Sequence, residues 1–275
     1  MIGLGRMGGP MADHVVGAGH DVRVHDVVAS AMEARAPGAV RCESPAQAAR
    51  SAGVVGIVVF DDAQAVEVVE GPGGVLETLE PGAVVVVHTT VRLGTIRELA
   101  RSAEACGVHL LDAGISGGEA GAADGSLVTM VGGAAEGLEE ARPVLEAFSK
   151  EIVHAGPLGA GMALKLARNA TGYALMATVH EAMTMAAHSG VDPQLLRHVI
   201  AETGVLDQGM TPFVLGGPDP LPADDVQLRP TMEHLLRLAV KDLDGALGLA
   251  AELGDELPVM EATLGSFARV TRLAP

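Results

Sequence analysis

The sequence predicts an α/β protein in which a doubly wound parallel sheet is followed by an all-helical domain. Short valine-rich runs alternate with alanine-rich amphipathic stretches from the first residue to about residue 155. A glycine-rich turn opens the chain, and the valine-rich runs stop after Gly156-Pro157. Strands that are buried on both faces of a parallel sheet are continuous apolar runs of this kind. We therefore expect two domains, at residues 1–156 and 157–275.

The strands of the first domain are expected where apolar runs lie between turn residues. These runs are residues 21–26, 54–60, 83–88 and 108–112, and residues 126–131 also resemble a strand. Ser44 and Pro45 supply a cap and a first-turn proline for one of the intervening helices. A central strand of about five residues should precede the first glycine turn, yet only Met1 and Ile2 do so. We expect further residues upstream of Met1 in the native protein.

The second domain is expected to be built from helices alone. Residues 161–189 are apolar almost all round a helix, which predicts a buried central helix. Further helical patterns cover residues 193–202, 231–252 and 258–272, and a proline- and glycine-rich stretch at 216–230 predicts a loop. Because this central helix is so apolar, we also expect it to contact a second copy of the chain, in a homodimer or tetramer.

Composition excludes several classes of function. The net charge of −17 opposes phosphate-rich partners, and aromatic residues at 2% give few platforms for stacking bases, so a nucleic-acid partner is not expected. No stretch is long and apolar enough to predict a membrane span. Cys42 and Cys106 stand alone without metal-type spacing, which favours reduced thiols and a cytoplasmic location. The histidines show no metal-binding pattern, so no metal site is predicted.

The opening glycines form a G-x-G-x-x-G motif at Gly3, Gly5 and Gly8. In a Rossmann-type fold such glycines permit the tight turn, the approach of backbone to a pyrophosphate, and the packing of helix on strand. Asp26 ends the second expected strand, 18 residues after Gly8, where a carboxylate can bind the ribose hydroxyls. Asp26 is followed by Val27, with no arginine there, which favours NAD over NADP, with NADP possible. A glycine-rich loop without a ligand and a solvated aspartate are the alternatives.

The segment from Asp112 to Gly118 contains a G-x-S-x-G pattern, the spacing of a hydrolase nucleophile elbow. That elbow requires a helix directly after the serine, and the following residues 119–125 predict none. We interpret Ser116 as a binding residue instead, because a hydroxyl and successive backbone N–H groups suit a substrate carboxylate. A serine hydrolase is the weakest alternative.

The expected central helix begins with Gly161, Lys165 and Asn169 at intervals of four residues, hence on one face. In apolar surroundings Lys165 is either a lysine that extends its amine to the surface or a base with a lowered pKa. Lys241, followed by Asp242, is a second candidate, although such helical pairs are more often simply solvated.

Together these motifs resemble the β-hydroxyacid dehydrogenases, which include 3-hydroxyisobutyrate dehydrogenase and tartronate semialdehyde reductase and are relatives of 6-phosphogluconate dehydrogenase. The matching segments, in the family's order, are residues 3–11, 112–118, 159–169 and 241–243. The resemblance implies a dinucleotide domain, a helical domain and an active site between them.

The resemblance also implies a role for individual residues. Lys165 would be the general acid/base, and the residues that hold the substrate would be Ser116, Gly117, Gly118 and Asn169. The residues that contact the cofactor would be Gly3, Leu4, Gly5, Arg6, Met7, Asp26, Val59, Phe60, Thr90 and Lys241.

Three departures from the family pattern leave the substrate open. Gly114 stands where the family commonly has proline, Val58-Val59-Phe60 where it has Met-Leu-Pro, and Arg168 where it has asparagine. Arg168 could lower the pKa of Lys165 or grip a second anionic group. The expected reaction is oxidation of a small 3-hydroxy acid by NAD. The alternatives are a semialdehyde or imine reductase, although the imine reductases usually lack the lysine, and a catalytically silent dinucleotide-binding protein.

Overall fold

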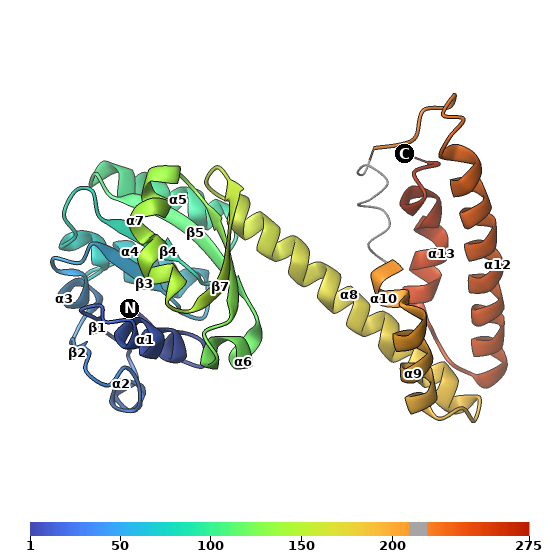
Figure 1. The fold of residues 1–275 in the computed structure, drawn as a ribbon, viewed down its shortest axis with the longest axis horizontal. Coiled ribbons are helices and arrows are strands. Elements are labelled where there is room, and N and C mark those ends of the chain that lie inside the picture. The colour runs from blue at the N-terminus through green and yellow to red at the C-terminus, as the bar shows by residue number, and fades with distance from the viewer. Residues whose placement is uncertain (209–218, 275) are drawn as a thin grey trace. The chain divides into compact units, whose positions relative to one another are not determined.

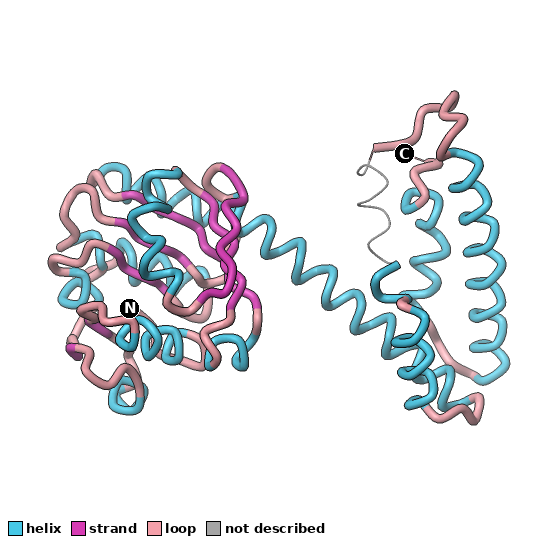
Figure 2. Tube along the Cα trace, in the orientation of Figure 1, coloured by secondary structure: helices cyan, strands magenta, loops and turns pink. Residues whose placement is uncertain are grey.

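The computed structural model describes residues 1–208 and 219–274. They form two compact units, Met1–Ala170 and Thr171–Pro275, and the boundary falls within one long helix (Figure 1). Within the described residues, all strands belong to the first unit, and the second is helical (Figure 2). The predicted fold class is therefore confirmed.

The first unit is organised around a five-stranded sheet. In spatial order its strands are β3 (Val54–Ile57), β4 (Val84–Val87), β5 (His109–Ser116), β6 (Leu127–Gly132) and β7 (Ser149–Gly156). A parallel pair, β1 (Arg23–Val24) and β2 (Val40–Arg41), lies beside it. Ile2 forms parallel bridges to both His25 and Ile57, so the chain start occupies the central position between β1 and β3.

One pair of strands departs from the parallel arrangement. β5 and β6 are antiparallel, whereas the β3–β4, β4–β5 and β6–β7 pairs are parallel. Only a short segment containing α6 (Gly118–Ala123) joins β5 to β6. A parallel crossover takes a dozen or more residues, so this connection returns the chain in the opposite direction.

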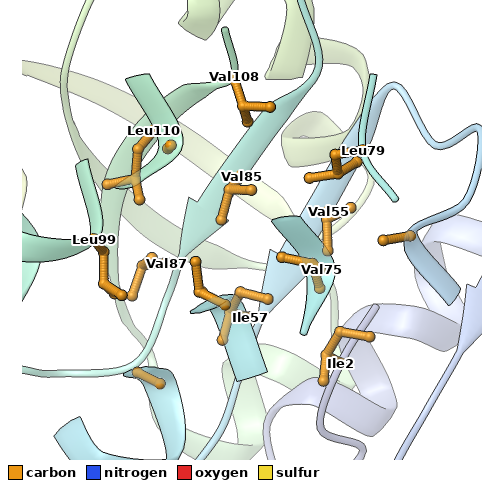
Figure 3. Close-up of a cluster of buried hydrophobic side chains, with 14 of the residues drawn as sticks. Ile2, Val55, Ile57, Val75, Leu79, Val85, Val87, Leu99, Val108 and Leu110 are labelled. Atoms are coloured by element: carbon orange, nitrogen blue, oxygen red, sulfur yellow. The ribbon is translucent and has the colours of Figure 1, made fainter. Parts of the chain in front are cut away.

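Helices cover both faces of the sheet, as a doubly wound fold requires. Their bounds are Gly8–Gly17 (α1), Ala29–Ala34 (α2), Pro45–Ala49 (α3), Asp62–Glu70 (α4), Leu93–Ala105 (α5) and Ala135–Glu146 (α7), with a 3₁₀ turn at Val75–Glu77. Val85 and Val87 of β4 pack under α3, α4 and α5 in one core cluster (Figure 3). Val84 and Val86 face α1 and α7 in another. This alternation explains why the strand is valine at every position.

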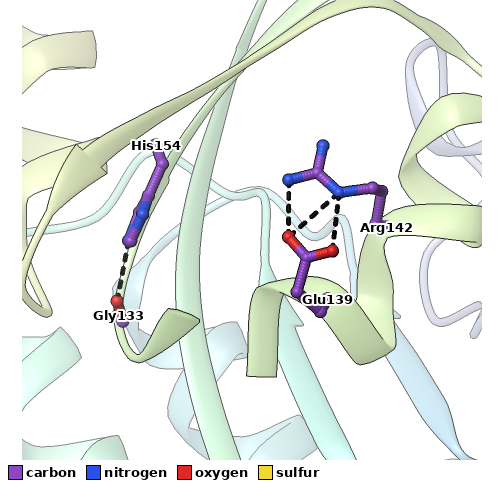
Figure 4. Close-up of polar contacts among 4 residues, drawn as sticks. All are labelled: Gly133, Glu139, Arg142 and His154. Atoms are coloured by element: carbon purple, nitrogen blue, oxygen red, sulfur yellow. Dashed lines mark hydrogen bonds and ion pairs between the residues drawn. The ribbon is translucent and has the colours of Figure 1, made fainter. Parts of the chain in front are cut away.

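The sequence predicts no strand at β7, because Lys150, Glu151 and His154 interrupt its apolar character. β7 is an edge strand whose side chains are partly exposed, so it needs no continuous apolar run. His154 Nε2 bonds to the carbonyl of Gly133 at 2.9 Å and ties β7 to the turn after β6 (Figure 4). On α7 beside it, Arg142 and Glu139 form an exposed ion pair.

The second unit consists of the end of α8 (Ala160–His188) with α9 (Pro193–Thr203), α10 (Val205–Gln208), α12 (Arg229–Leu253) and α13 (Pro258–Val270). The four predicted helices are confirmed to within a few residues. Of the predicted loop at 216–230, residues 216–218 lie outside the described residues, and 219–228 form turns and irregular backbone. No helix in the described part of the chain is long and apolar enough to cross a membrane.

The expectation that α8 is buried along its length is wrong for a single chain. Its first turns are buried at Gly161, Met162 and Lys165, and a later stretch is buried at Glu181 and Ala186. Between these stretches apolar side chains are open: Tyr173 is 68% exposed and Met176 69%. The apolar sequence reflects burial at two separate stretches, not a continuous one.

Candidate active site

The glycine turn at the chain start has two kinds of glycine. A Cβ added at Gly3, where φ is +87°, would lie 2.2 Å from the carbonyl oxygen of Val58, and one at Gly8 would lie 2.1 Å from that of Gly3. These two glycines are required by the chain's own packing. A Cβ at Gly5 meets nothing within 4 Å, so Gly5 leaves open space at the surface of the turn.

Asp26, two residues after the end of β1, is hydrogen-bonded to this turn. Its Oδ2 accepts a hydrogen bond from the backbone N–H of Leu4 at 2.6 Å, and its Oδ1 accepts one from Val28 at 2.8 Å. Both oxygens are held in place, and a carboxylate can still accept further bonds at each of them.

A cavity of about 740 Å³ lies over the turn. Of the predicted cofactor residues, Gly3, Gly5, Arg6, Met7, Asp26, Val59 and Phe60 line it. Leu4 does not, because its side chain is buried below, in a core cluster with Ala12 and Val24. The volume, the open backbone at Gly5 and the carboxylate at one side fit a dinucleotide.

The same cavity is also lined by residues that the sequence does not predict. Gln64, Glu67 and Val68 line it from α4, Pro45 from the start of α3 and Pro72 from the turn after α4. The three residues of α4 follow the i, i+3, i+4 spacing of one helix face, but nothing in the sequence indicates that this face borders a ligand.

Besides Leu4, two predicted cofactor residues are not part of this cavity lining. Thr90 is exposed just after β4. Lys241 belongs to the second unit, where its exposed ammonium pairs with Asp242 at 3.1 Å. Arg6, although in the lining, is engaged in an exposed ion pair with Glu119 at 2.9 Å.

Lys165 and Ser116 come together at the end of β5, from positions 49 residues apart in the chain. Lys165 is buried, and its Nζ donates a hydrogen bond to Ser116 Oγ at 3.2 Å. Burial lowers the pKa of this amine below its ordinary value, and the positive charge of Arg168 lowers it further. Such a lysine is more readily neutral near physiological pH than an exposed one.

The other predicted substrate residues lie near these two in the chain. Gly117 and Gly118 have φ values of +138° and +64°, a backbone that L side chains rarely adopt. Asn169 lies one turn after Lys165, half-buried, and its Oδ1 accepts a bond from Arg168 at 3.4 Å.

The expectation that no helix follows Ser116 is wrong, since α6 begins at Gly118. Five of its six residues are glycine or alanine, and Gly121 lies close to Leu127 of β6. The side-chain bond found for Ser116 is to Lys165, not to a histidine. Among the residues that the structure describes, no group of three or more His, Cys, Asp or Glu could hold a metal ion.

The chain is similar in sequence to known dehydrogenases. Residues 1–156 match the NAD binding domain of 6-phosphogluconate dehydrogenase. The chain is 40% identical to the NAD-dependent L-serine dehydrogenase of Pseudomonas aeruginosa, over 72% of this chain and 67% of that one. It is 39% identical to the 3-hydroxyisobutyrate dehydrogenase of the same organism, over 74% and 68%.

Solved structures extend the similarity to the full length. An oxidoreductase from Mycobacterium avium 104 has a TM-score of 0.85 and 36% identity, covering 100% of this chain and 98% of that one. The family model spans more than half of the chain, and relatives above 30% identity cover most of it. The chain therefore belongs to the β-hydroxyacid dehydrogenases, relatives of 6-phosphogluconate dehydrogenase, and is an NAD-dependent oxidoreductase.

Proposed function

We propose that this enzyme oxidises a small 3-hydroxy acid of the 3-hydroxyisobutyrate type, reversibly, with Lys165 as the general acid/base. The observation that carries the proposal is the buried Lys165 Nζ, 3.2 Å from Ser116 Oγ. A buried amine with a lowered pKa, beside a hydroxyl and a glycine-rich turn, suits proton transfer to and from an alcohol.

In the oxidising direction, neutral Lys165 takes the proton of the substrate hydroxyl and becomes an ammonium. The carbon–oxygen bond gains its double-bond character as a hydride leaves the same carbon. When bound, NAD supplies the acceptor for that hydride. In the reducing direction, the Lys165 ammonium returns the proton to the carbonyl oxygen.

The substrate carboxylate is assigned to the turn after β5. Ser116 Oγ can donate a hydrogen bond to it, and the left-handed backbone of Gly117 and Gly118 exposes N–H groups that can do the same. The Asn169 amide, one turn from Lys165, is proposed to orient the rest of the substrate. Fixing the acid in this way places its hydroxyl within reach of Lys165.

The cofactor is assigned to the cavity over the glycine turn, with the pyrophosphate at Gly5 and the adenosine ribose at Asp26. The Asp26 carboxylate repels a 2′-phosphate, which supports NAD over NADP. A higher kcat/KM with NADP than with NAD would contradict this choice.

A homodimer, or a tetramer assembled from it, belongs to the proposal. The support is the exposed apolar surface of α8, including Tyr173 and Met176, which a second copy would cover. A cytoplasmic location is proposed on the basis of the two free cysteines.

The direct test is Lys165→Ala in the purified enzyme. We expect turnover to be abolished while the affinity for NAD, measured by calorimetry, stays within about twofold. Lys150→Ala is the matched control, because Lys150 is an exposed lysine on β7. Wild-type turnover by Lys165→Ala would remove this residue from the mechanism.

The substrate class is tested by a panel of small 3-hydroxy acids, semialdehydes and a cyclic imine, followed by nicotinamide absorbance. Turnover of 3-hydroxy acids with NAD is expected. Turnover of the imine without any hydroxy acid would select an imine reductase, and cofactor binding without turnover of any compound would select a silent binding protein.

A further inference from the structure

We propose that Asp112 is a positioning residue whose carboxylate anchors the first turn of α8 and thereby places Lys165 against Ser116. Its side chain is fully buried within β5. Oδ1 accepts the backbone N–H of Gly159 and Oδ2 that of Met162, each at 2.6 Å. Gly159 directly precedes the helix that carries Lys165, and Met162 lies in its first turn.

The charge of Asp112 is balanced by the helix itself. No ion pair of Asp112 occurs within residues 1–208 and 219–274, so no cation neutralises it there. A buried carboxylate is tolerated where several N–H groups bind it, and the positive end of a 29-residue helix adds to this. The same interaction holds the helix at one place on the sheet.

Glycines around Asp112 make the contact close. A Cβ at Gly132 would lie 2.5 Å from Asp112 Oδ1, so only glycine leaves room there for the carboxylate. A Cβ at Gly161 would lie 2.4 Å from the carbonyl oxygen of Met130 and 2.6 Å from that of Asp112. The start of α8 is thus in backbone contact with β5 and β6.

The same face of β5 then guides the lysine. Asp112, Gly114 and Ser116 alternate along the strand and so face one side of the sheet. Asp112 binds the helix start, and Gly114 leaves room for the Lys165 stem, since a Cβ there would lie 2.6 Å from Lys165 Cβ. Ser116 meets the amine. A shift of the helix start would move Lys165 along this row.

The test compares two buried carboxylates that cap helices. Asp112→Asn replaces one accepting oxygen by an NH₂ group that faces an N–H. Glu181→Gln is the matched control, because Glu181 is buried and accepts the N–H groups of Val259 and Met260 at the start of α13. Both variants lose a cap, but only the first concerns Lys165.

Two readouts separate positioning from stability. For Asp112→Asn we expect kcat to fall about 100-fold, as for a reactive group displaced by about 1 Å, with KM for the acid and affinity for NAD changed less than about threefold. The pH at which Lys165 reacts half-maximally with acetic anhydride, followed by mass spectrometry, should rise because the displaced amine is better solvated. Glu181→Gln should change neither, although its melting temperature falls.

Wild-type kcat and an unchanged acetylation profile in Asp112→Asn would overturn the proposal and leave Asp112 as a helix cap alone. If Asp112→Asn does not fold, Gly161→Ala is the second test of the proposal. Its added methyl group displaces the start of α8 from the sheet and leaves the Asp112 carboxylate in place. Wild-type kcat in Gly161→Ala would also overturn the proposal. The inference rests on the proposed function. If the wild-type enzyme oxidises no hydroxy acid, that function fails, whereas the acetylation profiles still report where Lys165 lies.

Discussion

At the scale of single residues, Arg168 is the departure from the family pattern that acts on the pKa of Lys165. It lies one turn from Lys165 on α8 and adds to burial in lowering the pKa of that amine. Oxidation requires the neutral amine, so a lower pKa extends activity toward neutral pH. The residue that the family commonly carries here, asparagine, has no charge and removes this effect.

We therefore predict that Arg168→Asn shifts the acidic limb of kcat/KM for hydroxy-acid oxidation to higher pH. The reason is that the amine, freed of like-charge repulsion, keeps its proton to a higher pH. The pH dependence of initial rates measures this. Arg168→Lys, which keeps the charge, should retain the wild-type profile, and an unshifted profile in Arg168→Asn would exclude the electrostatic role.

At the residue scale, the sequence predicts candidate site residues only where they lie in a recognisable motif. Lys165 and Ser116 lie in separate motifs, and the structure brings them into hydrogen-bond contact. Asp112 lies in the same motif as Ser116, but its function could not be predicted. Its partners are backbone N–H groups 47 and 50 residues away, and backbone donors have no sequence signature.

At the scale of elements, glycines have two different roles at the turn before α1. Gly8 is required for packing, because its Cβ would meet the carbonyl of Gly3, while Gly5 leaves space that the chain does not use. We predict that Gly5→Ala keeps the wild-type melting temperature but weakens NAD binding at least about tenfold. Gly8→Ala should lower the melting temperature by several degrees, as expected for a clash of backbone with an added methyl.

Differential scanning fluorimetry and calorimetric titration with NAD measure the two effects on the same samples. Normal NAD affinity in Gly5→Ala would show that the pyrophosphate does not approach this glycine. A wild-type melting temperature in Gly8→Ala would show that the turn can relax.

At this scale, the strands that the sequence predicts most directly are those buried on both faces. The valine-rich strands are buried on both faces, and their apolar runs identify them. The sequence does not predict β7, which carries charges on an exposed edge, or α6, which has only six residues, five of them glycine or alanine. Antiparallel pairing of β5 with β6 depends on the length of that missed helix.

At the scale of the whole molecule, one buried histidine links folding to pH. His88 is 3% exposed at the end of β4, bonds to the Ala113 carbonyl at 2.9 Å and packs edge-on against Phe148. Burial lowers its pKa to about 4, so the folded protein holds it neutral where the unfolded chain, at 6.5, takes up a proton. This stabilisation is complete above pH 6.5 and is lost as the pH falls toward 4.

We predict that the lowered pKa of His88 alone decreases the free energy of unfolding by about 3 kcal/mol as the pH falls from 6.5 to 4. His88→Gln, which keeps a hydrogen-bond donor but does not titrate, should show a weaker loss over this interval in urea denaturation. His109→Gln, at an exposed histidine, is the control for substitution as such. Equal pH dependence in His88→Gln and wild type would exclude this linkage.

The proposed self-association of the whole molecule rests on the exposed apolar stretch of α8. Tyr173 and Met176, 68% and 69% exposed, lie in a stretch of α8 without a charged residue between Arg168 and His180. Large apolar side chains that are exposed to water on one helix are unfavourable unless a partner covers them. A second copy offers the same apolar stretch, so a symmetric pairing buries both.

We predict that the wild-type protein runs in multi-angle light scattering at two or more times the 27.9 kDa of one chain. The double variant Tyr173→Glu/Met176→Glu should weaken association at least about tenfold, because the interface would then bury like charges without partners. Val226→Glu, at a position 84% exposed in the segment before α12, introduces the same charge as a control. A monomeric wild type at micromolar concentration would refute the dimer, and a dimeric double variant would move the interface away from α8.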